Sequence, residues 1–475
     1  MKSGIVYNMI SRVLFILGAY VLHVGLARLL GPREYGVFGV VLSVLMICYI
    51  FLNNGVRQAV ARLAASHPES SGTILYHGLK YQIAIGLILA AALIVFNPLL
   101  VRFLGDRMVR APLYIAAGIV ATQGIYFVFA GVLNGQRRFL SESIVLSTYA
   151  VARPLAAISV AWLGRNAGGA VAGLLTASVV SILVGGYLCR GGPRAPIDTS
   201  RLKLLDIAWP TMLAFGFISL VMNLGMIVLK HYSGGNAEVV GFYTAASAMA
   251  SFPYWVLFAF GNVGMPIISH GFGRGENGFV RDTIRQLTAH VFILVAPATV
   301  ILAAVGGELV KAMFTAKFAA AASPFFILIF GIFFLGVASI FAHCLVAVGR
   351  ERAMLVWTLT AGALCIALNV VLVPNYLMLG AAAATGIASL VMAAGLAVAL
   401  GLATGPFVRL RSAAKWAVVL AGVWLIAVQI KGGLPALIAG SALLYLAAVG
   451  ALSLWGELHP GKLIAELRAR KLNQT

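Results

Sequence analysis

Long runs of apolar residues follow one another along almost the whole chain, separated by short polar connections. A helix that crosses a bilayer needs about 20 mostly apolar residues, and these runs have that length. They are continuous and do not alternate with polar residues, so the pattern indicates helices and not a membrane barrel. The chain is therefore expected to be an all-α membrane protein with fourteen transmembrane helices. The predicted spans are 8–28, 36–56, 79–101, 112–133, 140–163, 168–189, 206–229, 239–266, 287–305, 323–347, 353–373, 379–403, 414–430 and 434–455.

The composition agrees with this pattern. Of the 475 residues, 61% are hydrophobic and 10% are charged, whereas a soluble domain has about 25% charged residues. This balance excludes a soluble enzyme and a disordered tail protein. The four cysteines have no metal-ligand spacing, so neither a metal site nor a cofactor is expected. The sequence has no phosphate-binding glycine loop, zinc motif or nucleophile elbow, so no enzymatic activity is expected either.

The charge balance is strongly basic, with 34 Lys and Arg residues against 13 Asp and Glu and a net charge of +21. The basic residues separate apolar runs and do not cluster on a soluble face, which favours anionic lipid or an anionic substrate over nucleic acid. The two ends of the chain and the even-numbered connections hold more than twice as many of them as the odd-numbered connections. The positive-inside rule then places both termini in the cytoplasm.

Short motifs of the first half recur in the second half in the same order. Residues 35–38 open the second span with Tyr-Gly-Val-Phe, and residues 240–243 open the eighth with Val-Gly-Phe-Tyr. Four such pairs lie about 205–214 positions apart. A repeated six-span unit predicts two six-helix bundles related by a pseudo-twofold along the membrane normal, a layout typical of transporters with a site between the bundles. The predicted units are an N-terminal lobe (1–195), a C-terminal lobe (196–407), and two extra helices with a cytoplasmic tail (408–475).

Arg153 lies near the centre of the fifth predicted span, beside Pro154. An arginine at that depth costs at least about 2.5–3.5 kcal/mol and should face water or a partner. Two interpretations stay open. Arg153 either lines a wet cavity, or it pairs with backbone carbonyls or with Glu142.

Four further polar residues lie at the cytoplasmic ends of the first two spans. Arg12 interrupts the first span, and Asn53, Asn54 and Arg57 end the second. Their structural interpretation is snorkelling to lipid headgroups for Arg12 and an ordinary positive-inside anchor for the others. Their functional interpretation is that they line the same cavity as Arg153.

Acidic residues are informative through their positions, because no Asp or Glu lies in the middle of a predicted span. A proton-driven exporter of cationic drugs usually needs such a carboxylate as counter-ion and relay. A cavity with arginine and no acid instead favours an anion. Arginine also binds phosphate through two N–H groups at once.

Two segments resemble the signatures of a known family. Residues 26–38 read Leu-Ala-Arg-Leu-Leu-Gly-Pro-Arg-Glu-Tyr-Gly-Val-Phe, and residues 369–374 read Asn-Val-Val-Leu-Val-Pro, followed by Gly-Ala-Ala-Ala-Ala-Thr at 380–385. With the fourteen-span plan, they resemble the polysaccharide and oligosaccharide flippases of the multidrug/oligosaccharidyl-lipid/polysaccharide exporter superfamily. The resemblance implies a two-lobed bundle that moves lipid-linked glycans across the bacterial inner membrane. Family members often carry an acid midway through the seventh span, where this chain has Gly225.

The resemblance and the basic spans together predict a flippase that moves a polyprenyl-pyrophosphate-linked oligosaccharide by alternating access for polysaccharide export. Arg28 and Lys230, near the outer face, are expected to form an exit gate. The expected substrate-binding residues are Arg12, Asn53, Asn54, Arg57 and Arg153.

The expected partners are the lipid-linked substrate and membrane lipids. The protein is expected to be a monomer that works alongside a glycan polymerase and glycosyltransferases. Two alternatives stay open. One is a multidrug or metabolite exporter of the same superfamily, and the other is a non-transporting membrane scaffold of a glycan-assembly complex, which would tolerate Arg153→Ala.

Overall fold

The computed structural model describes residues 2–53, 56–193, 195, 204–407, 410–430 and 434–453, and these residues form helices and no strand. Eleven helical segments in this part of the chain are long and apolar enough to cross a membrane, which confirms the all-α membrane fold. The α-helices are α1 (Lys2–Asn53), α2 (Val56–Ser66), α3 (Ser71–Leu104), α4 (Arg110–Gly135), α5 (Phe139–Gly164), α6 (Ala167–Leu188), α7 (Leu204–Tyr232), α8 (Ala237–Ala250), α9 (Phe252–Gly273), α10 (Asn277–Phe314), α11 (Ala322–Ala347), α12 (Glu351–Thr404), α13 (Leu410–Ala427) and α14 (Leu434–Leu452).

Two long helices each contain two of the predicted spans. Helix α1 is broken at Gly31, where φ is 72°, and α12 is broken at Leu377, where φ is 45° and ψ is −119°. Glycine adopts this left-handed conformation without the steric penalty of a side chain, so the break in α1 has a signal in the sequence. Leu377 itself gives no such signal, but the break follows Pro374 and lies in the gap between the two predicted spans.

Two other predicted elements differ from the structure. The eighth predicted span, 239–266, is divided into α8 and α9 at Ser251, just before Pro253. Proline is favoured in the first turn of a helix, so it marks the start of α9. The ninth predicted span, 287–305, is part of the longer helix α10, which continues to Phe314 and is followed by a 3₁₀ turn at Ala316–Ala321.

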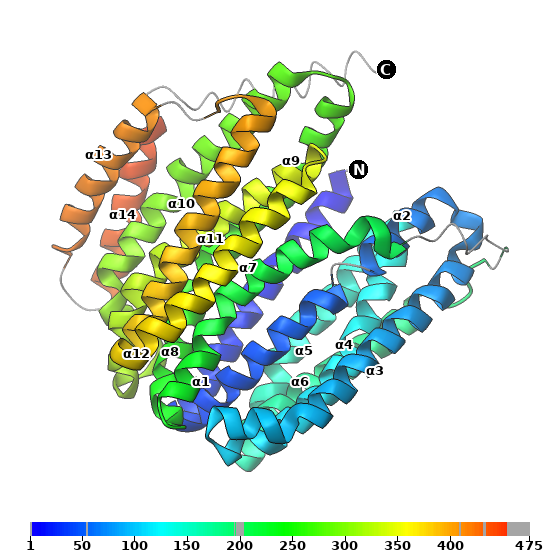
Figure 1. Ribbon diagram of the computed structural model, residues 1–475, viewed down its shortest axis with the longest axis horizontal. Helices are drawn as coiled ribbons and strands as arrows, with labels where there is room; N and C mark the ends of the chain where they lie inside the picture. The colour runs from blue at the N-terminus through cyan, green and yellow to red at the C-terminus, as the bar shows by residue number, and fades with distance from the viewer. Residues whose placement is uncertain are drawn as a thin grey trace.

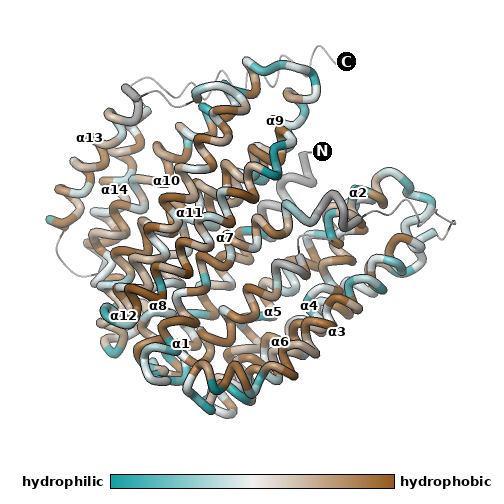
Figure 2. The backbone as a smooth tube through the Cα atoms, viewed as in Figure 1, coloured by the Kyte–Doolittle hydropathy of each residue, from teal (hydrophilic) through white to brown (hydrophobic). Residues whose placement is uncertain are grey.

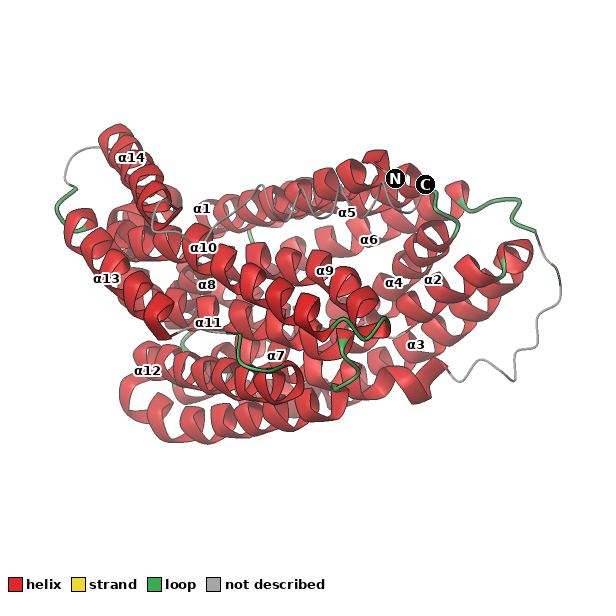
Figure 3. Cartoon of the chain, turned by 90° about the horizontal axis from the view of Figure 1, so that it is seen from above, coloured by secondary structure: helices red, strands yellow, loops and turns green. Residues whose placement is uncertain are grey.

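The helices pack as two groups, and α1 of the first group also contacts helices of the second (Figure 1). The N-terminal group consists of α1 to α6 and the C-terminal group of α7 to α12, while α13 and α14 pack beside α10. Helix α1 contacts both α5 and α8. In the view from above, α13 and α14 lie at the opposite side of the molecule from α3 (Figure 3). The predicted boundaries near 195 and 407 lie in the connections after α6 and after α12. The pseudo-twofold relation between the two lobes stays a prediction.

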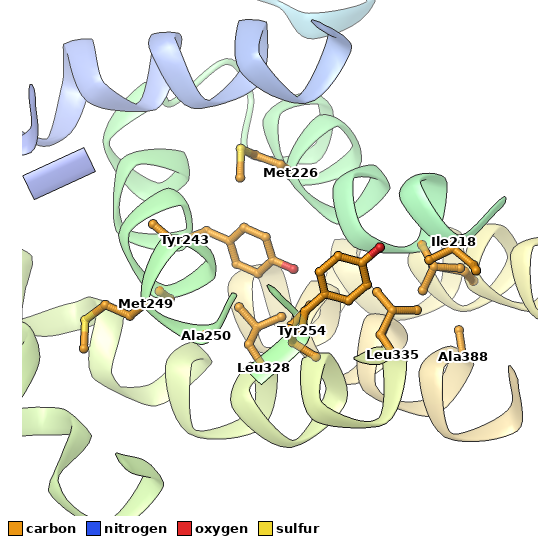
Figure 4. Close-up of a cluster of buried hydrophobic side chains, with 14 of the residues drawn as sticks. Ile218, Met226, Tyr243, Met249, Ala250, Tyr254, Leu328, Leu335 and Ala388 are labelled. Carbon is orange, nitrogen blue, oxygen red and sulfur yellow. The ribbon is translucent and has the colours of Figure 1, made fainter. Parts of the chain in front are cut away.

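Apolar residues dominate the middle of the helices, and polar residues gather at their ends and in the connections (Figure 2). Inside the C-terminal group, side chains of α7, α8, α9, α11 and α12 form a continuous core (Figure 4). Tyr243 and Tyr254 are buried there beside Leu328 and Leu335. The same core continues into α1 and α3 to α6, so it joins the two groups.

Two ends of the molecule are distinguished below by their residues. Helix α1 is broken at Gly31, and its second half runs back toward α2, which contains Arg57 (Figure 1). The break in α1 and the start of α2 therefore mark opposite ends of the molecule. These are called the Gly31 end and the Arg57 end.

Candidate functional site

Arg153 of α5 is a buried arginine without an ionic partner in the described part of the chain. It is 6% exposed, and its Nε and Nη2 atoms have no hydrogen-bond partner. Its guanidinium carbon lies 4.7 Å from the centre of the Phe15 ring and 5.8 Å from that of Tyr149. Two aromatic faces stabilise the charge in part, and two N–H donors are left for an acceptor.

Phenol groups surround Arg153 inside the N-terminal group. Tyr126 and Tyr149 stack with ring centres 5.0 Å apart, and Tyr126 accepts a hydrogen bond of 2.9 Å from Nε2 of Gln123. Tyr49 and Tyr126 both lie within range of the Arg153 charge, and the Tyr49 hydroxyl is buried without a partner. A positive charge among hydroxyl donors is an environment that suits an anion.

Arg57, at the start of α2, has an acidic partner. Its Nη2 lies 3.3 Å from Oε1 of Glu142, whose Oε2 accepts a hydrogen bond of 2.7 Å from Asn134. Its guanidinium also lies 5.6 Å from the centre of the Phe127 ring. The carboxylate considered as a partner of Arg153 is therefore held by Arg57 and Asn134, which leaves the interior guanidinium of α5 without it.

Arg12 lies on an exposed face of α1, within electrostatic range of Arg57 and Glu142 and also of His343 in the C-terminal group. Three of the predicted substrate-binding residues thus lie on α1 or close to it. They are Arg12, Arg57 and Arg153. The side chain of Asn53 and the whole of Asn54 lie outside the described residues.

Aromatic side chains of the C-terminal group face this basic region. Phe15 of α1 meets Trp255 of α9 edge to face at 5.7 Å, and Phe258 packs 5.2 Å from the ring of His343 on α11. Neither α9 nor α11 contains a Lys, Arg, Asp or Glu residue. The charged side chains of this region therefore come from the N-terminal group, and α9 and α11 of the C-terminal group supply an aromatic surface.

Arg28 and Lys230, predicted as a gate, both contact the opposite group at the Gly31 end. Arg28 donates hydrogen bonds of 2.7 and 2.6 Å to the carbonyls of Met313 and Ala312 in the last turn of α10. Lys230 is fully buried, and its Nζ lies 2.6 Å from Oδ2 of Asp106, in the connection after α3. These contacts, called the latch here, join α1 to α10 and α3 to α7.

The backbones of α1 and α8 approach closely beside the latch. A Cβ atom on Gly36 would clash with the carbonyl of Ala237, and one on Gly241 would clash with the carbonyl of Pro32. Only glycine permits this approach, so the Gly31 end is tightly closed in this conformation.

Sequence reasoning missed the roles of two kinds of residue at this site. Asp106 and Glu142 carry the ionic contacts of Lys230 and Arg57, and each lies in a connection or at a helix start where acidic residues are ordinary. Phe15 and Tyr149, which flank Arg153, were hidden among many apolar positions. No group of three or more His, Cys, Asp or Glu that could hold a metal ion occurs among the described residues.

Comparisons with known proteins place the chain in a family. A family model described as "Polysaccharide biosynthesis protein" matches residues 25–323. An uncharacterized membrane protein of Methanocaldococcus jannaschii, MJ1068, is 22% identical over 409 residues, which cover 81% of this chain and 80% of the relative.

Solved structures show the same fold at low sequence identity. Lipid II flippase MurJ in an inward closed conformation has a TM-score of 0.72 at 16% identity, covering 95% of this chain and 98% of that one. An inward-facing multidrug resistance MATE family transporter of the MOP superfamily has a TM-score of 0.64 at 15% identity, covering 87% and 98%. A MOP superfamily transporter from Pyrococcus furiosus, with a binding pocket of reverse polarity, has a TM-score of 0.62 at 16% identity, covering 86% and 96%.

The family model spans more than half of the chain, and the structural likeness extends over nearly all of it. The chain therefore belongs to the polysaccharide biosynthesis protein family, as a multi-pass membrane protein with the fold shared by MurJ and the MATE transporters.

Proposed function

We propose that this protein is a flippase that moves a polyprenyl-pyrophosphate-linked oligosaccharide across the plasma membrane for polysaccharide export. In this proposal both termini and the Arg57 end face the cytoplasm, and the Gly31 end faces outward. The excess of basic residues on the connections of the Arg57 end supports that orientation.

The observation that carries the proposal is the unpaired charge of Arg153. A buried cation without a hydrogen-bonded partner is unfavourable by several kcal/mol, on the order of the cost of desolvating a single ion. A diphosphate would satisfy the free N–H groups of Arg153, with Arg12 close enough to the same region to add charge. The site is therefore built for an anion that arrives and leaves, because no resident carboxylate fills it among the described residues.

The latch supplies the other half of an alternating-access cycle. Arg28 and the Lys230–Asp106 pair hold the Gly31 end closed, so a headgroup would enter from the Arg57 end while its lipid tail stays in the bilayer. Release on the outer side then requires the latch to break and the two groups to rock about α1. The headgroup would shift the equilibrium between the two conformations if its pyrophosphate binds Arg153 with different affinity in each.

An exporter of cationic drugs is the alternative that the fold permits, since the MATE transporter shares the fold. The aromatic surface of Trp255 and Phe258 would suit such a substrate. The basic side of the site opposes it, because Arg12, Arg57 and Arg153 would repel a cation. A scaffold without transport has no use for the unpaired Arg153.

The test is a translocation assay in proteoliposomes that contain the purified protein. The probes are a fluorescent short-chain polyprenyl-pyrophosphate oligosaccharide, the same glycan on a neutral polyprenol, and a cationic dye. The proposal expects transfer of the pyrophosphate probe between leaflets and little transfer of the other two. Transfer of the dye alone would establish the exporter, and transfer of none in a correctly folded preparation would support the scaffold.

A further inference from the structure

A basic cavity lies at the Arg57 end, and Arg153 is not among the residues that line it. It has a volume of about 190 Å³ and opens between the start of α3, the end of α4 and the connection after α6. Its walls include Ser71, Gln136, Arg138 and Arg190, over an apolar floor of Leu75 and Val132. The cavity holds far more than one water molecule, which takes up about 30 Å³ in the liquid. It is called the α3–α6 pocket below.

The polar groups of the α3–α6 pocket are donors without acceptors. Ser71 is 1% exposed, and its hydroxyl is buried without a hydrogen-bond partner. Arg138 and Arg190 are exposed at the rim and form no ion pair with any described residue. No acidic residue is among those that line the cavity. The Arg190 guanidinium lies 5.5 Å from the centre of the Tyr187 ring, which leaves its N–H groups for other acceptors. A buried hydroxyl and two guanidinium groups without a carboxylate partner form a donor set that suits phosphate oxygens.

The remaining lining residue that could ionise stays neutral. Burial raises the pKa of the Cys189 thiol to about 11, against an opposing effect of the nearby Arg138 charge. The thiol is thus protonated at physiological pH and supplies no negative charge to compensate the arginines. The excess positive charge of the pocket is therefore available to a ligand.

The walls of the pocket are fixed by hydrogen bonds between elements distant in sequence. The amide of Gly72 donates to the carbonyl of Pro193 at 2.7 Å, and the Thr73 hydroxyl donates to the carbonyl of Ala195 at 3.0 Å. Gly191, with φ of 76°, makes the turn that brings this connection back onto α3. The donors are thereby held in place before a ligand binds, which lowers the entropic cost of binding.

The surroundings of the pocket resemble a membrane surface. Tyr76 and Tyr187, one helical turn or less from lining residues, are 65% and 67% exposed. Tyrosines at this level are typical of the boundary between lipid tails and headgroups. The phosphates of the adjacent leaflet would therefore lie within reach of Arg138 and Arg190.

We propose that the α3–α6 pocket is a binding site for a phosphate group, taken from an anionic lipid headgroup or from soluble phosphate. Because its occupant contacts α3, the α4–α5 turn and the connection after α6 together, it clamps these three elements at the Arg57 end. This site is separate from the proposed translocation site and does not depend on it.

The experiment measures the unfolding temperature of the purified protein in detergent, since a ligand that binds only the folded state raises it. The probes are dioctanoyl phosphatidylglycerol, dioctanoyl phosphatidylcholine and inorganic phosphate. The proposal expects a rise with phosphatidylglycerol, inorganic phosphate or both, and little with phosphatidylcholine. A rise with the lipid alone identifies a headgroup as the source, and a rise with inorganic phosphate identifies the phosphate itself.

Substitutions in the pocket test whether the rise in unfolding temperature comes from binding there. Arg138→Gln with Arg190→Gln should weaken binding of the effective probe at least tenfold, and Ser71→Ala should weaken it several-fold. The matched control, Arg62→Gln with Lys80→Gln, removes the same charge from exposed positions outside the pocket and should bind as the unaltered protein does. The proposal is overturned if no anionic probe raises the unfolding temperature. The proposal is also overturned if the pocket variants bind the probe as tightly as the control does. If the double variant fails to fold, Ser71→Ala alone provides the same comparison.

Discussion

The Gly31 end and the interior around Arg153 differ in how positive charge is paired. At the Gly31 end, Lys230 is paired with Asp106 at 2.6 Å, and Arg28 is satisfied by two carbonyls of α10. In the interior, Arg153 has aromatic faces around it and two nitrogen atoms without acceptors. Paired charges stabilise one arrangement of the two groups, whereas an unpaired charge favours whatever anion enters. The difference separates the residues that hold the conformation from those that bind.

Breaking the Lys230–Asp106 pair should change the conformation of the Gly31 end more than any other substitution proposed at that end. Because Lys230 is fully buried, Asp106→Ala leaves a buried cation without its partner, which costs about 3–5 kcal/mol. We expect the Gly31 end to open and the Arg57 end to close. Spin labels at positions 62 and 352, on opposite groups at the Arg57 end, should then move closer together in a cysteine-free background. An unchanged distance would mean that the pair does not hold the latch.

Adding one methyl group beside the latch should have the next largest effect. Gly241→Ala places a Cβ against the carbonyl of Pro32, and overpacking of this kind costs about 1–3 kcal/mol. The same pair of labels should again report a shorter distance at the Arg57 end. Gly422→Ala, where nothing lies within 4 Å of an added Cβ, is the matched control and should leave the distance unaltered.

Freeing Arg57 should enlarge the unpaired basic region. Glu142→Gln removes the charge that Arg57 contacts at 3.3 Å while keeping an oxygen for Asn134. Glu142 is buried and Arg57 is only 28% exposed, so this pair is worth at least the roughly 1 kcal/mol of a good exposed pair. Binding of a pyrophosphate headgroup should therefore tighten by about fivefold or more. Fluorescence titration with a short-chain polyprenyl pyrophosphate measures it. Weaker binding would show that Glu142 positions Arg57 for the ligand and does not compete with it.

Arg28 should give the smallest effect. It is exposed, and a cation at a helix C-terminus contributes about 0.3–1 kcal/mol. Arg28→Gln should therefore change the label distance at the Arg57 end less than Asp106→Ala does. A change as large as that of Asp106→Ala would place the main closing contact at α10 and not at α7.

Much of the fold could be predicted from the sequence because the bilayer imposes both length and composition on each span. The fourteen predicted spans map onto the observed helices, with two pairs merged across the breaks at Gly31 and Leu377. The break at Leu377 lies in the gap between the predicted spans 353–373 and 379–403. The division at Ser251 was missed, although Pro253 in the first turn of α9 gives a signal for it. The family resemblance carried by residues 26–38 is confirmed by the match over 25–323.

The candidate site could be predicted only in part. Arg12 and Arg153 stand out because charged residues are rare within spans, and an unusual residue in an apolar run is visible without a structure. Their surroundings depend on pairs distant in sequence, such as Lys230 with Asp106, 124 positions apart, and Arg57 with Glu142, 85 positions apart. A single sequence shows which residues need partners and gives no means of choosing among the partners available.

The most direct test of the account is the rate at which Arg153→Ala moves the fluorescent polyprenyl-pyrophosphate oligosaccharide in proteoliposomes. Losing a hydrogen bond to a charged group costs about 1.5–3 kcal/mol, which corresponds to a decrease of about tenfold to a hundredfold in binding. We expect the transport rate of Arg153→Ala at low substrate concentration to decrease by that factor. Arg153→Lys should recover part of the rate, and the exposed control Arg352→Ala should show no decrease. Transport by Arg153→Ala at the unaltered rate would contradict the account.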